Sequence, residues 1–172
     1  MLKLAKKKVR KANVASLIVV GEGIHDRAFL NHMKDNYDGR KTGQVVKIES
    51  SDGGSPRNIL MSAKKSQEAA YDKRYVLMDS DVAIQQQDWA YAEKHKIEVI
   101  LSAPVCLEGM LLDVLGIKAG TCGDSCKTKL KPFLGGCPTQ KTSYQKSFSK
   151  EVLDTTEKEA IVSLRALISN QK

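Results

Sequence analysis

The sequence contains no apolar run long enough to cross a membrane. Its longest, Val14–Val20, has the length of a strand, whereas a spanning helix needs about 20 apolar residues. The basic segment Met1–Lys11 precedes this run, but no small-residue cleavage site separates the run from the Gly-Glu-Gly that follows. This pattern argues against a secretory signal, so we expect a cytoplasmic protein with no membrane partner.

Cysteine is also scarce, and without a secretory signal we expect no disulfide framework. In a reducing cytoplasm we expect thiols or metal ligands. The C-x₃-C of Thr-Cys-Gly-Asp-Ser-Cys is wider than the usual spacing of structural zinc ligands, which also number four. Free thiols are therefore the favoured interpretation, and zinc remains an alternative. The four cysteines are Cys106, Cys122, Cys126 and Cys137.

Acidic residues are outnumbered, with 20 Asp and Glu against 28 Lys and Arg and a net charge of +8. A basic surplus favours a polyanionic partner. Nucleic acid is the first candidate, an anionic membrane surface is the second, and a basic protein without such a partner is the alternative. Two basic segments, an arm at 1–13 and the region 117–150, supply the candidate phosphate contacts Lys6, Lys7, Lys8, Arg10, Lys127, Lys129 and Lys131.

Apolar runs alternate with helical patterns along the middle of the chain. The length of 172 residues suits one domain, which we place at 14–172. The continuous apolar character of 14–20 is typical of a strand buried on both faces. The alternation predicts a mostly parallel four-stranded α/β sheet flanked by helices, with strands at 14–20, 45–48, 75–78 and 98–101 and helices at 28–37, 57–70, 85–96 and 108–115.

The region 117–150 interrupts this alternation. It is rich in Gly, Lys, Thr, Ser and Cys, so we expect an irregular basic insertion, either a long loop or a small subdomain. Its aromatic residues Phe133, Tyr144 and Phe148 have two interpretations, stacking on bases or anchoring the insertion to the core, and the anchor is favoured. An apolar stripe over 150–171 predicts one C-terminal helix.

Three carboxylates follow predicted strands. Glu22 comes after the first strand, and Asp79 and Asp81 come after the third. The carboxyl ends of parallel strands meet at one rim of a sheet. Asp79 and Asp81 would share one cation if strand geometry persists through Ser80. Grouped carboxylates repel one another without a cation, and their oxygens are the ligands that Mg²⁺ prefers. The pattern predicts Mg²⁺ or Mn²⁺ here, although each acid alone is also typical of a turn.

This arrangement resembles the Toprim domain, the catalytic fold of topoisomerases, primases and OLD-family nucleases, and within that group it most resembles RloB-like proteins. The matching segments are LIVVGEGIHDRAFL, SDGGSPRNIL, YVLMDSDV and SAPVCLEGMLLDVLG, within about residues 15–116. The resemblance implies that Glu22, Asp79 and Asp81 bind the principal metal. It also implies that Asp26 and Glu108 complete a second metal position or orient a water.

Two features depart from the family pattern. Asp26 stands where the family usually has Glu, and Val105 is inserted between Pro104 and Cys106. Asp26 and Glu108 also have a structural interpretation, since each begins a predicted helix, where the helix dipole favours an acid. His25 is more readily explained as an exposed helix-start residue than as a base. Cys106 lies among apolar residues and is expected to be buried.

The function that follows is a Mg²⁺-dependent nuclease that hydrolyses nucleic-acid phosphodiesters, with anti-phage defence implied by the resemblance. The alternative is a non-catalytic nucleic-acid-binding or sensor module that partners an effector. Nucleotidyl transfer is a third option. The chain lacks the GxxxxGK[ST] loop, so any ATPase partner would be a separate subunit, and a homo-oligomer is compatible with the sequence.

Overall fold

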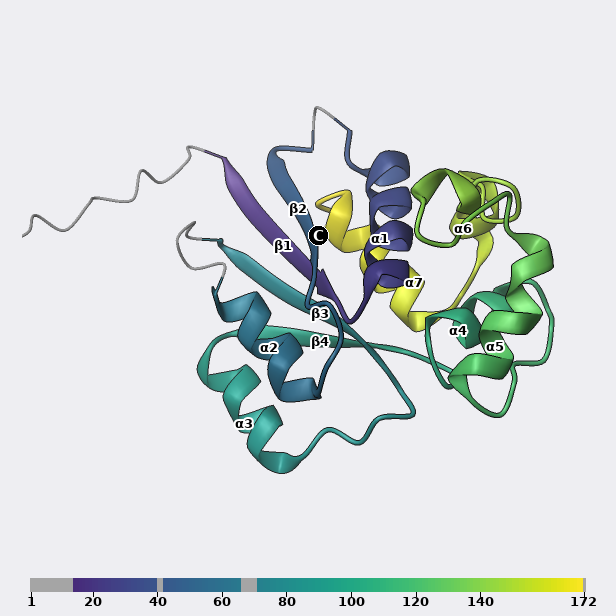
Figure 1. Cartoon of the computed structure of the whole chain (residues 1–172). Helices are drawn as coiled ribbons and strands as arrows, with labels where there is room; N and C mark the ends of the chain where they lie inside the picture. Colours follow the sequence, from purple (N-terminus) through teal and green to yellow (C-terminus); the bar gives the residue numbers. More distant parts are fainter. Residues whose placement is uncertain (1–13, 40–41, 66–70, 172) are drawn as a thin grey trace, which may run out of the picture.

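Four parallel strands form the centre of the fold (Figure 1). The structure, a computed structural model, describes residues 14–39, 42–65 and 71–171. The strands lie in the order β2-β1-β3-β4 and every pairing is parallel, which confirms the predicted α/β sheet. Their bounds are β1 Ala15–Gly21, β2 Gln44–Ser50, β3 Lys73–Asp79 and β4 Ile97–Ser102.

Helices cover both faces of the sheet, and the alternation along β1 explains why. Leu17 and Val19 are buried in the cluster that includes α1 (Ile24–Tyr37) and α7 (Glu159–Ile168). Ile18 and Val20 are buried in the opposite cluster, against α2 (Pro56–Lys65) and α3 (Gln86–Lys94). Alternate residues of a strand point to opposite faces. A strand covered by helices on both faces therefore needs apolar side chains at successive positions, as β1 has.

The strand order creates a crevice at the carboxyl ends of β1 and β3. β2 lies on one side of β1, and the chain then crosses to β3 on the other side. In open α/β sheets ligands bind where the order reverses in this way. The register pairs Gly21 with Leu77, so Glu22 and Asp79 emerge beside each other at this point.

The region 117–150 is more regular than predicted. It contains α5 (Gly123–Leu130) and the short 3₁₀ helices η2 (Lys131–Phe133) and η3 (Lys141–Tyr144). α5 packs on α4 (Leu107–Val114), and the two form a lobe beside the sheet (Figure 1). The expectation of an irregular segment was therefore wrong for these residues. Elements this short carry little periodicity, because packing rather than local propensity stabilises them.

The aromatic residues of this region anchor it to the core, as favoured from the sequence. Tyr144 and Phe148 are 1% and 0% exposed. The Tyr144 ring meets the Phe29 ring of α1 edge-on at 5.5 Å between centroids, and its hydroxyl donates to the carbonyl of Pro138 at 2.9 Å. Phe133 is partly buried and packs against the same cluster.

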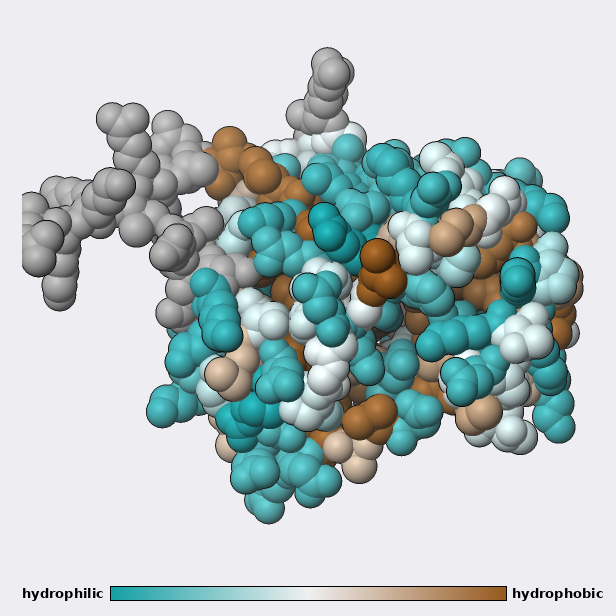
Figure 2. Space-filling view, in the orientation of Figure 1, coloured by the Kyte–Doolittle hydropathy of each residue, from teal (hydrophilic) through white to brown (hydrophobic). Residues whose placement is uncertain are grey.

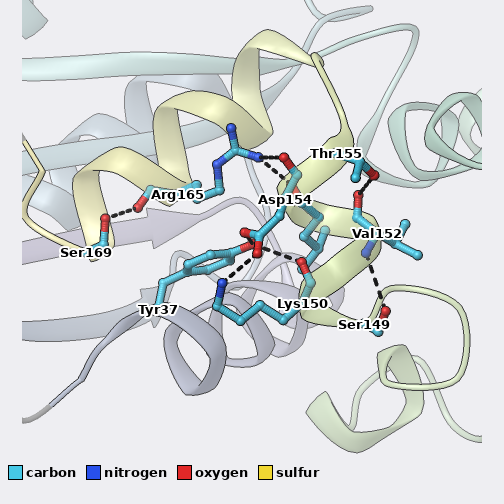
Figure 3. A network of polar contacts seen from close by, with 9 residues as sticks. Tyr37, Ser149, Lys150, Val152, Asp154, Thr155, Arg165 and Ser169 are labelled. Carbon is cyan, nitrogen blue, oxygen red and sulfur yellow. Dashed lines mark hydrogen bonds and ion pairs between the residues drawn. The ribbon is translucent and has the colours of Figure 1, made fainter.

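The single predicted C-terminal helix is two helices, α6 (Lys150–Thr155) and α7. A polar network holds the end of α6 (Figure 3). Asp154 accepts hydrogen bonds from the Tyr37 hydroxyl at 2.7 Å and from the Lys150 ammonium at 2.6 Å. Arg165 of α7 donates to the carbonyl oxygens of Leu153 and Asp154 at 2.6 and 2.8 Å. These bonds satisfy the last carbonyls of α6, so the chain turns back onto α1.

Gly21 permits the close approach of α1 to the end of β1. A Cβ atom at Gly21 would lie 2.5 Å from the Cβ of Asp26, whereas one at Gly23 would meet nothing nearer than 3.7 Å. We expect Gly21→Ala to lower the free energy of unfolding by about 1–3 kcal/mol through overpacking. Gly23→Ala is the matched control and should change it by less than about 1 kcal/mol. Urea denaturation measures both, and equal stabilities would contradict the close approach.

Candidate active site

Four carboxylates from separate elements surround one cavity at the carboxyl ends of β1 and β3. Its volume is about 240 Å³, and Lys127 of α5 contributes a positive charge. Figure 2 shows this face hollowed between the sheet and the lobe of α4 and α5, with hydrophilic side chains and a few hydrophobic ones around the hollow. Four of the five acids considered from the sequence thus share one cavity, namely Glu22, Asp26, Asp79 and Glu108.

Asp79 is the last residue of β3 and is held from two sides. Its Oδ1 accepts hydrogen bonds from the Ser102 hydroxyl at 3.1 Å and from the backbone N–H of Leu107 at 3.2 Å. Burial and the neighbouring charge of Glu22 outweigh these bonds and raise the pKa of Asp79 to about 6. The strand end and the start of α4 together fix this carboxylate at the cavity wall.

Asp26 lies in the first turn of α1 and is only 7% exposed. Its Oδ2 accepts the backbone N–H of Gly23 at 3.0 Å, which confirms its helix-start role. Its Oδ1 is buried and has no hydrogen-bond partner among the described residues. Burial, followed by the charge of Asp79, raises the pKa of Asp26 to about 7. One oxygen of Asp26 therefore serves the helix, and the other is left for a proton or a cation.

Glu108 lies in the first turn of α4 and pairs with His25, which the sequence had favoured as an exposed helix-start residue. His25 Nδ1 lies 2.8 Å from Glu108 Oε1, and Glu108 is 6% exposed. His25 is not simply an exposed helix-start residue, since its side chain is 26% exposed and lines the cavity. The signal that could have indicated this role is its place beside Asp26 in the sequence.

Asp81 is placed differently from Asp79. β3 ends at Asp79, and Ser80 and Asp81 form a turn in which the Asp81 N–H donates to the carbonyl of Val105 at 3.0 Å. Strand geometry therefore does not persist through Ser80, and the exposed Asp81 does not line the cavity. Val105, with φ of 66°, forms the other side of this turn. A metal-binding role for Asp81 remains a prediction.

The lysines predicted to contact phosphate also differ in where they lie. Lys127 lines the carboxylate cavity and a neighbouring cavity, and Lys131 lines the neighbouring one only. Lys129 lines neither and donates to the carbonyl of Lys118 at 3.4 Å. The remaining contacts predicted from the sequence, which belong to the arm at 1–13, lie outside the described residues; they are Lys6, Lys7, Lys8 and Arg10.

The cysteines are all free thiols. Cys106 and Cys126 are buried, as expected for Cys106, and Cys122 and Cys137 are exposed. Burial raises the pKa of the Cys106 thiol, which disfavours the thiolate form that a nucleophile needs. Cys106 instead precedes α4 and packs in the core beside Leu107.

The fit of these residues to a metal ion is mixed. Within 14–39, 42–65 and 71–171, no group of three or more His, Cys, Asp or Glu side chains could hold a metal ion as it stands. The buried, unpartnered Oδ1 of Asp26 and the four converging acids nevertheless suit a cation. Mg²⁺ usually keeps several waters and takes one or two carboxylates directly. A hydrated ion therefore fits this donor set better than a tight cage.

Comparisons with known proteins return no match, whether with protein-family models, with curated proteins or with solved structures. The resemblance to Toprim and RloB-like proteins therefore remains a prediction from the sequence. No helix in the described part of the chain is long and apolar enough to cross a membrane.

The raised pKa of Asp26 makes stability depend on pH in metal-free buffer. Its folded value of about 7 lies above its ordinary value of 3.8, so between these values the folded protein keeps a proton that the unfolded chain loses. Stability should therefore fall as pH rises through this window. Asp26→Asn keeps an oxygen for the Gly23 N–H and cannot ionise, so at pH 8 it should be about 1–4 kcal/mol more stable than wild type.

Urea denaturation at pH 4, 6 and 8 with a chelator measures this effect. The advantage of Asp26→Asn should shrink steadily towards pH 4. Asp35→Asn is the control, because Asp35 is exposed on the same helix and pairs with Lys141. An advantage that is equal at all three pH values would show that ionisation of Asp26 does not cost stability.

Proposed function

We propose that this protein is a Mg²⁺- or Mn²⁺-dependent phosphodiesterase that hydrolyses nucleic acid. The observation that carries the proposal is the meeting of Glu22 and Asp79 at the strand-order reversal, with Asp26 and Glu108 in the same cavity. Such a crevice is where open α/β sheets bind ligands. Four clustered acids with raised pKa values at two of them favour a cation as the missing partner.

The four acids divide into two sets by their contacts. Glu22 and Asp79 are the metal ligands that we propose first, and the free Oδ1 of Asp26 extends the set. Glu108 is held by His25 at 2.8 Å and is suited to accept a proton from an attacking water on that side of the cavity. When bound, the metal would polarise the scissile phosphate and make water a better nucleophile.

Lys127 supplies the positive charge that a phosphate needs beside the carboxylates. It is exposed on α5 and lines the cavity opposite the strand ends. Donors that face developing negative charge in a sheltered cavity stabilise the transition state more than they would in water. The net charge of +8 adds a long-range attraction for nucleic acid.

A role in anti-phage defence, a separate ATPase subunit, self-association and a cytoplasmic location belong to this proposal as well. The first two derive from the resemblance to RloB-like and OLD-type proteins. The sequence lacks the ATP-binding GxxxxGK[ST] loop, so a partner that controls access to substrate would supply any ATPase activity. Co-purification from cells that express the chain would identify such a partner.

A non-catalytic nucleic-acid-binding or sensor module is the alternative function. Two observations favour it: Asp81 lies outside the cavity, and the described acids form no ready metal group. In that case the basic residues alone would carry the activity. Strong binding with a steep dependence on salt, and no cleavage with Mg²⁺ or Mn²⁺, would select this alternative.

Cleavage assays on single-stranded DNA, duplex DNA and tRNA with a Mg²⁺ titration test the proposed function. We expect Mg²⁺-dependent cleavage of at least one substrate, and a loss of at least about 100-fold in Glu22→Gln and Asp79→Asn, because ligand loss removes transition-state charge stabilisation. Both variants should remain folded, since each removes repulsion. Asp35→Asn is the matched control and should cleave normally. Wild-type rates in both cavity variants would refute the proposal.

Thermal unfolding at pH 8 separates metal binding from catalysis. A ligand that binds only the folded state raises its stability by RT ln(1 + [L]/Kd). We therefore expect Mg²⁺ to raise the Tm of wild type and of Asp35→Asn, but not of Glu22→Gln. Asp81→Asn in the same series tests the predicted role of Asp81. A Tm that Mg²⁺ leaves unchanged in wild type would argue for the non-catalytic module.

A further inference from the structure

A second cavity adjoins the carboxylate cavity and differs from it in chemistry. Its volume is about 310 Å³. Three residues line both cavities, His25, Glu108 and Lys127, so the two are direct neighbours. Two carboxylates of the first cavity, Glu22 and Asp79, come from strand ends, whereas the other walls of the second cavity come from α5 and the segment that follows it, at the right of Figure 1.

The floor of this second cavity is apolar and belongs to the core. Leu130 and Leu134 are 1% and 8% exposed, and Pro138 completes the floor. The Pro138 carbonyl is held by the Tyr144 hydroxyl at 2.9 Å, so the floor is tied to a buried aromatic anchor. A volume near 300 Å³ lies at the lower end of small-ligand sites, which suits one flat ring system and not a folded chain.

Two lysines flank the apolar floor. Lys127 of α5 and Lys131 of η2 line the cavity, while Lys129, between them in the sequence, does not. An apolar slot with cations at its rim, directly beside a site for a phosphate, matches one ligand in particular: a nucleotide whose phosphate lies among the carboxylates and whose base enters the slot.

We propose that this cavity is a nucleobase subsite that receives an unpaired base next to the scissile phosphate. The proposal rests on the proposed function for the identity of that phosphate. A base that enters a slot of this size cannot remain paired or stacked in a duplex, so the subsite selects single-stranded or flipped nucleotides. The apolar floor offers contact to any base, which makes the selection tolerant of sequence.

Binding of two probes that differ only by the base tests this subsite. The probes are deoxyadenosine 5′-monophosphate and deoxyribose 5-phosphate, measured by calorimetry at saturating Mg²⁺. We expect the nucleotide to bind at least about tenfold more tightly, because only the nucleotide carries a base whose apolar faces leave water against the cavity floor. Equal affinities, or no binding of either probe, would overturn the proposal.

Two tryptophan variants provide a matched pair that leaves the core intact. Thr128 and Lys129 are both exposed on α5, but only Thr128 lines the cavity. Thr128→Trp fills the slot and should reduce the affinity ratio of the two probes to about one, whereas Lys129→Trp should preserve the ratio. A ratio that survives in Thr128→Trp would also overturn the proposal.

The ratio also keeps this inference separate from the proposed function. Because the probes share sugar and phosphate, a missing or altered metal site lowers both affinities alike and leaves their ratio unchanged. Suppose that no Mg²⁺-dependent cleavage is found, but that the nucleotide binds more tightly and Thr128→Trp abolishes this difference. The phosphodiesterase would then be refuted and the base subsite retained. Mg²⁺-dependent cleavage with equal affinities for the two probes would support the phosphodiesterase and refute the base subsite.

Discussion

Charge repulsion among partly buried carboxylates is the constraint on which the site depends. Glu22, Asp26, Asp79 and Glu108 surround one cavity, and burial raises the free energy of their ionised forms. Asp26 and Asp79 respond with pKa values of about 7 and about 6. Acids placed in this way destabilise the folded protein locally. The cation that we propose would neutralise their charge and offset this cost. Such costs are typical of functional sites.

The rest of the structure holds these acids together despite the repulsion. The parallel sheet places the ends of β1 and β3 side by side, and Gly21 lets α1 approach closely enough to bring Asp26 to the cavity. The start of α4 and the end of β4 hold Asp79 through Leu107 and Ser102. The positions of the carboxylates therefore depend on packing across the whole sheet and not on one loop.

α5 and the segment that follows it supply the second cavity and the lysine shared with the first. α5 carries Lys127 to the edge shared by a charged cavity and an apolar one, and buried Tyr144 and Phe148 fasten the lobe to α1. The roles that we propose for the two cavities, a polar region for phosphate and an apolar slot for a base, correspond to the two parts of a nucleotide. His25 and Glu108 lie at the boundary of the two cavities.

The sequence by itself determined the sheet and the acids that follow its strands. An apolar run such as Val14–Val20 requires cover on both faces, and Glu22 and Asp79 must then emerge at the rim. Only the tertiary structure decided which acids share the cavity. His25 meets Glu108 from 83 positions away, and Asp81 is turned aside at Val105. These outcomes depend on how distant segments pack and turn. Local sequence periodicity carries no information on such contacts.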